Sequence, residues 1–194
     1  MRCGTVLSSH ELGQPGAYRL TRDPSLYVKF ELKKENSKKK EYVLVWTTTP
    51  WTLPANVAIA VHPDLSYTCY EFEKEYIWAV KLPEKLAQKV KDGEIKIIKS
   101  VRGASLIGKK YVPLYAHKEA KNTYKIVSAD FVSAEEGTGL VHIAPAFGEE
   151  DMALGTEKNL PMIQHVDKTG RIKEEARDNF AGMEVKPKED TQKT

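Results

Sequence analysis

The sequence predicts an α+β protein that is mainly β, with a β-barrel core flanked by short helices. Eight short segments alternate between apolar and polar residues and are rich in β-branched and aromatic side chains, whereas only two segments show helical periodicity. So many strands would leave exposed edges in an open sheet. We therefore expect antiparallel strands that close, or nearly close, into a barrel.

The expected strands follow one another at short intervals. Only Glu73, Lys74 and Glu75 separate the fourth from the fifth, a length typical of a hairpin. The lysine-rich stretch 35–41 predicts an exposed connection, because its like charges and low hydrophobicity cannot supply a packed face. The eight segments are 27–32, 41–48, 56–61, 67–72, 76–80, 95–101, 124–132 and 138–144.

Two segments predict helices. The first, 83–93, carries an apolar stripe at helical spacing and ends at Gly93. The second, 148–159, opens with three consecutive acids, which suit the positive end of a helix dipole.

The length of 194 residues predicts one domain with appended arms. We expect an N-terminal arm over 1–22 and a C-terminal arm over about 171–194, both extending from that domain. The C-terminal arm has few apolar residues to bury, so we expect it to end disordered or docked elsewhere.

The net charge, the apolar runs and the cysteine count exclude several classes of protein. A net charge of +3 does not by itself mark a nucleic-acid-binding protein, and no apolar run approaches the ~20 residues that span a bilayer. The N-terminus lacks the features of a secretory signal, so we expect a cytoplasmic location and no membrane contact. Cys3 and Cys69 cannot build a zinc site alone, and the five histidines lack metal-ligand spacing, so we expect no metal.

The first informative segment is VWTTTPWTLPAN, residues 45–56. In a straight strand Thr47 and Thr49 share one face and Thr48 points to the other, so the three line one site only if the strand bends. Pro50 supplies a reason to bend, because proline cannot donate to a strand ladder. The segment then forms a ledge of hydroxyls beside Trp51. Alternatively, the threonines simply favour a strand and the tryptophan fills the core.

The second informative segment is EEGTGLVHIAPAFGEED, residues 135–151. Gly137 and Gly139 allow the backbone to approach a ligand closely. The following strand and turn carry His142 and Asp151 toward a common pocket. The alternative is structural, with a satisfied core histidine and an acid at a helix N-terminus.

Together the two segments resemble the editing domain of isoleucyl-tRNA synthetase, the insertion called connective polypeptide 1. The similarity extends to 23–32, 58–67 and 107–115. The valyl and leucyl members of this fold type carry an arginine where this chain has Thr49, which favours the isoleucyl member. The HIGH and KMSKS signatures of aminoacylation are not found, so we expect no aminoacylation by this chain. Cys3 is similar to the last cysteine of a Cys-x-x-Cys-Gly knuckle, which indicates an excerpt from a larger synthetase.

The resemblance implies hydrolytic editing of Val-tRNA(Ile), and of valyl-adenylate in addition. One methylene in a hydrophobic pocket changes the binding free energy by only ~1–3 kcal/mol, which limits how well valine is rejected in favour of isoleucine. Isoleucyl-tRNA synthetase is itself the known example of this limit. A second sieve must therefore hydrolyse the smaller product. The implied partners are the tRNA(Ile) acceptor end and the rest of the synthetase chain. Editing needs no cofactor, since ATP serves only the absent aminoacylation domain. The alternatives are a non-catalytic β-barrel that binds the acceptor end, and a deacylase that acts in trans.

The resemblance also implies site residues. Asp151 would bind the substrate ammonium, and His142 would form the wall that excludes the extra methylene; as the obvious titrating group, His142 is alternatively a base. The implied catalytic set is Thr47, Thr48, Thr49, His142 and Asp151. The implied substrate-binding set is Trp46, Trp51, Thr52, Asn56, Gly137, Gly139 and Phe147, with Asn56 supporting the threonines.

Overall fold

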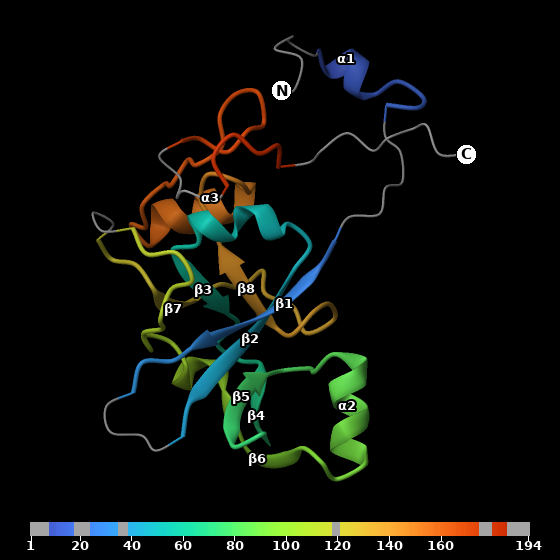
Figure 1. Cartoon of the computed structure of the whole chain (residues 1–194), viewed down its shortest axis with the longest axis vertical. Coiled ribbons are helices and arrows are strands. Elements are labelled where there is room, and N and C mark those ends of the chain that lie inside the picture. The colour runs from blue at the N-terminus through green and yellow to red at the C-terminus, as the bar shows by residue number, and fades with distance from the viewer. Residues whose placement is uncertain (1–7, 18–23, 35–38, 118–120, 175–179, 186–194) are drawn as a thin grey trace. The chain divides into compact units, whose positions relative to one another are not determined.

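The structure is a computed structural model that describes residues 8–17, 24–34, 39–117, 121–174 and 180–185 (Figure 1). Its contacts divide the chain into one compact unit of residues 24–163 and another made of 1–23 with 164–194. The predicted arms, 1–22 and about 171–194, fall within the second unit; that they lead to a larger synthetase stays a prediction. Cys3, Gly4 and residues 35–38 of the lysine-rich connection lie outside the described residues.

Two sheets form the unit of residues 24–163, and β2 of the first lies beside β8 of the second. The first sheet has the order β1-β2-β5-β4-β6, with β1 (Leu26–Glu31), β2 (Glu41–Thr47), β4 (Ser66–Phe72), β5 (Glu75–Ala79) and β6 (Lys96–Arg102). The second has the order β7-β3-β8, with β7 (Lys125–Ser128), β3 (Ala58–Val61) and β8 (Leu140–Ile143).

The helices are short. None of those that the structure describes is long and apolar enough to cross a bilayer. The two predicted ones are present as α2 and α3, and the other three helical segments were not predicted. The helices are α1 (Ser9–Leu12), η1 (Pro50–Ala55), α2 (Glu84–Lys91), η2 (Gly103–Ser105) and α3 (Glu149–Glu157).

The predicted class, mainly β with short helices, is confirmed, and among the described strands no closed barrel is found. The expectation of purely antiparallel strands is wrong, because β2 pairs with β5, and β3 with β7, in parallel. Between β2 and β5 the chain passes through η1, β3 and β4, so β5 returns in the direction of β2. Alternation reveals which residues form a strand but not which strand lies beside it.

The β4–β5 hairpin is confirmed, with a shorter loop than predicted. Glu73 and Lys74 alone form the turn, at φ of 51° and 68°, and Glu75 already pairs with Phe72. A two-residue turn with two positive φ values matches the right-handed twist of the flanking strands.

The apolar residues of this unit form two clusters. The larger one is centred on side chains such as Phe30, Tyr67 and Tyr111, all fully buried, and the apolar side of α2 packs against it. The smaller one joins the second sheet to Leu154 of α3. The second cluster therefore anchors α3 at the end of β8, where the chain carries Asp151.

Gly139 gives a test of this packing. It has a φ of +75°, and a Cβ there would lie 2.7 Å from the Cβ of Val80; Gly93 has a similar φ of +78° but open space around it. We expect Gly93→Ala to cost about 1 kcal/mol of unfolding free energy from backbone strain alone. Gly139→Ala should cost about 2 kcal/mol more, because Val80 must move. Urea unfolding of both variants checks this, and equal losses would contradict the packing argument.

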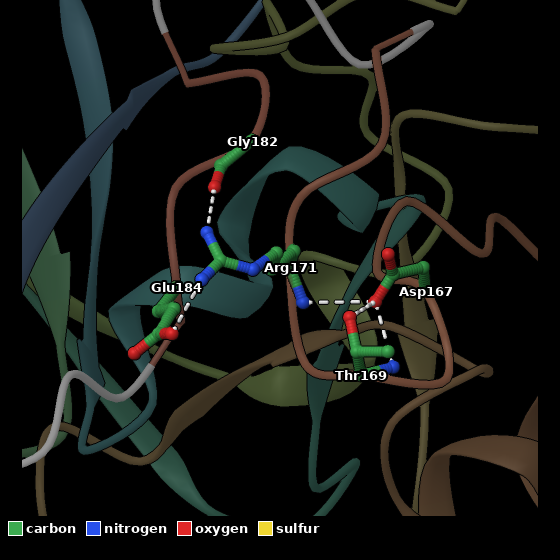
Figure 2. Close-up of polar contacts among 5 residues, drawn as sticks. All are labelled: Asp167, Thr169, Arg171, Gly182 and Glu184. Atoms are coloured by element: carbon green, nitrogen blue, oxygen red, sulfur yellow. Dashed lines mark hydrogen bonds and ion pairs between the residues drawn. The ribbon is translucent and has the colours of Figure 1, made fainter. Parts of the chain in front are cut away.

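In the other unit, five residues between Asp167 and Glu184 form a polar cluster (Figure 2). Asp167 Oδ1 accepts hydrogen bonds from Thr169 N (2.8 Å), Thr169 Oγ1 (2.7 Å) and Arg171 N (3.0 Å). The Arg171 guanidinium donates to the Gly182 carbonyl (2.8 Å) and pairs with Glu184 (2.7 Å). The C-terminal arm was expected to end disordered or docked elsewhere, and its end, residues 186–194, lies outside the described residues.

Candidate functional site

A cavity of about 480 Å³ lies where β2 and β8 end and α3 begins. It brings together both segments singled out in the sequence. Its lining residues are Trp46, Thr47, Thr48, Thr49, Thr52, Phe131, Ser133, Glu136, Gly137, Thr138, Gly139, Leu140, Val141, His142, Phe147, Gly148, Glu150 and Asp151.

The threonines reach this cavity because the chain leaves the strand among them. β2 ends at Thr47, and Thr49 precedes η1, whose first residue is Pro50. The backbone N–H of Thr49 donates to Thr47 Oγ1 at 3.1 Å, which closes the bend. Proline is favoured at a first helical position, since its missing N–H has no partner there in any case. The bend places Thr47, Thr48 and Thr49 along one cavity.

The hydroxyls form a chain that ends at His142. Thr47 Oγ1 lies 3.4 Å from Thr49 Oγ1, which lies 3.3 Å from Thr52 Oγ1. Thr52 Oγ1 donates to the Thr49 carbonyl at 2.8 Å and lies 3.1 Å from His142 Nε2. A hydroxyl has one proton, and that of Thr52 is committed to the carbonyl, so His142 Nε2–H is the donor to Thr52. Nδ1 of His142 is therefore the unprotonated nitrogen.

The His142 side chain is 6% exposed, on β8 opposite Ile59. Burial disfavours the imidazolium and lowers the pKa of His142 to about 4. The ring is therefore neutral near pH 7, and a pKa so far below neutrality suits a general base poorly. These properties favour an apolar wall over a base.

The low pKa of His142 predicts a loss of stability in mild acid. An unfolded histidine titrates near 6.5, so between about pH 6.5 and pH 4 the unfolded chain binds a proton that the native ring does not. Unfolding free energy should therefore fall as pH falls, by about 2 kcal/mol between pH 7 and pH 5 from this group. Urea unfolding of wild type and His142→Gln at both pH values measures the contribution. A pH dependence unchanged by the substitution would contradict it.

Asp151 lies in the first turn of α3 and points back to the preceding strand. Its Oδ2 accepts the Ala144 N–H at 2.8 Å, while Oδ1 makes no hydrogen bond to any residue that the structure describes. Burial raises the pKa of this carboxyl, and the bond from Ala144 partly opposes that shift. One oxygen thus fixes the side chain, and the other remains for a ligand.

The charge of the cavity is negative. Glu136, Glu150 and Asp151 are its carboxylates, and no described lining residue is a lysine or an arginine. With His142 neutral, the lining attracts a cation and repels an anion. A primary ammonium fits such a site.

Two predicted substrate-binding residues do not line the cavity. Trp51 packs against Phe147, which does, with ring centroids 5.4 Å apart and planes at 85°. Asn56 is buried elsewhere: its Nδ2 donates to the Ala58 carbonyl (2.8 Å), and its Oδ1 accepts from the Tyr111 hydroxyl (2.6 Å). Neither partner is a threonine, so the Asn56 side chain bonds to Ala58 and Tyr111 where support of the threonines was predicted.

The two glycines of the second segment do line the cavity, but their close approach is to protein. A Cβ at Gly137 would lie 2.8 Å from Trp46 Cε3, and Gly139 packs against Val80 in the same way. Gly137 therefore lets Trp46 lie flat on the backbone at the cavity edge. The prediction that these glycines make room for a ligand overlooked these two side chains.

Sequence reasoning did not single out several lining residues. Most of them lie within the segment 135–151, from which only some residues were chosen, since the whole stretch from Glu136 to His142 lines the cavity. Phe131 and Ser133, by contrast, precede the segment and carry no pattern of their own. The residues missed are Phe131, Ser133, Glu136, Thr138, Leu140, Val141, Gly148 and Glu150.

No protein-family profile matches the chain. Curated relatives are isoleucine–tRNA ligases: that of Thermus thermophilus is 44% identical over 173 residues, covering 88% of this chain and 16% of the ligase, and that of Clostridium novyi is 42% identical over 172 residues with the same coverage. That of Pyrococcus horikoshii is 43% identical over 189 residues, covering 89% of this chain and 17% of the ligase. The chain thus spans about one sixth of the length of these relatives.

Two solved structures share this fold. The crystal structure of GlLeuRS-CP1 superposes with a TM-score of 0.57 at 20% identity, covering 69% of this chain and 60% of that one. The editing domain of P. knowlesi cytosolic leucyl-tRNA synthetase gives 0.53 at 15% identity, covering 71% and 66%. The chain is thus similar in sequence to isoleucine–tRNA ligases and in fold to synthetase editing domains. Its cavity is built from the two segments that carry the sequence resemblance.

Proposed function

We propose that this editing domain hydrolyses the ester of valine on tRNA(Ile), as the second sieve of an isoleucyl-tRNA synthetase. The observation that carries the proposal is one cavity that combines a free carboxylate oxygen of Asp151, the neutral imidazole of His142 and a chain of threonine hydroxyls. These groups can bind the amine of the substrate, limit the length of its side chain and hold its ester in position.

Recognition begins with the amine. The α-ammonium of the aminoacyl group pairs with Asp151 Oδ1, in a cavity whose other carboxylates, Glu136 and Glu150, favour the same charge. The valine side chain then lies toward the imidazole of His142. That ring is fixed by its bond to Thr52, so it sets a rigid limit on side-chain length.

Hydrolysis needs a positioned water more than a strong base. A threonine hydroxyl is a poor proton acceptor near neutral pH, and His142 is neutral with its Nε2–H already donated. The hydroxyls of Thr47, Thr48 and Thr49 hold the ester and the water. The adjacent ribose hydroxyl assists as the water oxygen bonds to the carbonyl carbon, the acyl–oxygen bond breaks, and the ribose oxygen leaves with a proton. The products are valine and free tRNA.

The remaining partners follow from this reaction. The tRNA(Ile) acceptor end delivers the ester, the rest of the synthetase delivers the acceptor end, and valyl-adenylate presents the same valyl group. Editing uses no cofactor, and the cytoplasm is where such a synthetase acts.

Release of labelled valine from Val-tRNA(Ile), followed by thin-layer chromatography, tests the proposal. The chain should accelerate release over the buffer control and leave Ile-tRNA(Ile) intact. If the chain instead protects the ester, it is a binding module for the acceptor end. Equal hydrolysis of both esters would contradict the second sieve.

A further inference from the structure

Two buried polar atoms of the cavity lining make no hydrogen bond to any residue that the structure describes: Nδ1 of His142 and Oγ1 of Thr138. Thr138 is 1% exposed. A buried hydroxyl without a partner costs stability, whereas a valine of the same shape would avoid that cost. The mechanism above uses His142 but gives the Thr138 hydroxyl no part.

The position of Thr138 is fixed by its surroundings. Its carbonyl accepts the Val80 N–H at 2.8 Å, and both neighbours, Gly137 and Gly139, have positive φ values of 66° and 75°. Those glycines pack directly against Trp46 and Val80. The backbone that carries the hydroxyl is therefore held in place on both sides.

Thr138 and His142 lie at different points of the cavity lining. His142 is within β8 (Leu140–Ile143), whereas Thr138 precedes that strand and is separated from it by Gly139, whose φ is 75°. Under the proposed function, His142 and Asp151 receive the aminoacyl group. Thr138 instead follows Gly137, against which Trp46 packs, so the part of the substrate that remains for it is the nucleoside that carries the ester.

We propose that Thr138 is a binding residue for that nucleoside, and that its hydroxyl hydrogen-bonds a polar group of the terminal ribonucleoside. The half-buried Trp46, which packs against the neighbouring Gly137, supplies an aromatic face for the base. This inference rests on the proposed function, because it assigns the second half of the same substrate.

The test uses two ligands and two variants. The ligands are a non-hydrolysable valyl-adenosine analogue and valinamide, which has the amine and side chain but no nucleoside. Thr138→Val removes the hydroxyl and keeps the shape, and Thr138→Ser keeps the hydroxyl. We expect Thr138→Val to bind the analogue about 5- to 10-fold more weakly by calorimetry, with valinamide affinity unchanged. Thr138→Ser should bind the analogue as wild type does, and the urea midpoint of Thr138→Val should match or exceed that of wild type.

The failures are distinguishable. If wild type binds the analogue and Thr138→Val binds it equally well, the inference is wrong and the proposed function stands. If Thr138→Val loses affinity for both ligands, or unfolds at lower urea, the hydroxyl is structural and the inference is again wrong. Wild type that binds neither ligand contradicts the proposed function, and this inference with it.

Discussion

Asp151→Asn should lower the rate of Val-tRNA(Ile) hydrolysis about 100-fold, because it replaces a charge-assisted bond to the ammonium with a neutral one. The substitution is chosen for the geometry of the site. Asparagine keeps a carbonyl oxygen for the Ala144 N–H, the bond that ties α3 to β8. The melting temperature should therefore change little while the deacylation rate falls.

Glu150→Gln is the matched control. It removes the same charge from the neighbouring residue of the cavity, but the structure gives Glu150 no bond to the β8 segment. Its deacylation rate should stay within about threefold of wild type, as expected for a charge that is solvent-exposed. N-acetylvalyl-tRNA(Ile), which lacks the ammonium, should resist the wild-type enzyme. Wild-type rates for Asp151→Asn would reject the ammonium contact.

His142→Ala should retain hydrolysis of Val-tRNA(Ile) and gain hydrolysis of Ile-tRNA(Ile). Removing the ring opens the end of the cavity that excludes the longer side chain, and a one-methylene distinction is worth only ~1–3 kcal/mol. Selectivity for valine over isoleucine should therefore fall at least about tenfold. Deacylation of both esters under single-turnover conditions measures this ratio directly.

The opposite result has a clear meaning. If His142→Ala loses hydrolysis of both esters with its fold intact, the imidazole acts as the base and not as a size limit. His62→Ala is the control, because His62 lies outside the cavity lining and its Nδ1 accepts only the Asp64 N–H. That variant should hydrolyse Val-tRNA(Ile) and spare Ile-tRNA(Ile) as wild type does.

The strands could be predicted because the alternating pattern that indicates a strand lies within each segment itself. The segment predicted over 41–48 is β2 (Glu41–Thr47), and that predicted over 67–72 is β4 (Ser66–Phe72), in which Tyr67 and Cys69 are buried. Alternating apolar residues mark the buried face of a strand within the segment itself. The parallel partners were not predictable in this way, because the pairing of Tyr42 with Ile77 depends on the path of all the chain between them.

The candidate site shows the same difference between features that depend on neighbouring residues and features that depend on distant ones. Local chemistry predicted the bend at Pro50 and the acid at the start of α3, and both bring side chains to the cavity. Asn56 was misplaced because its partner Tyr111 lies 55 residues away. Thr138 was missed because nothing in Gly-Thr-Gly reveals that its hydroxyl is buried without a partner.

The bond between Thr52 and His142 joins residues 90 positions apart. Forming a contact of such high sequence separation requires a large loss of chain entropy, so such contacts form late and slowly in folding. In addition, a polypeptide growing on the ribosome has the threonines of the site long before it has His142 and Asp151, which complete the site. Under the proposed function, hydrolysis of Val-tRNA(Ile) should appear abruptly, only once α3 has been synthesised and packed, and shorter nascent chains should show none.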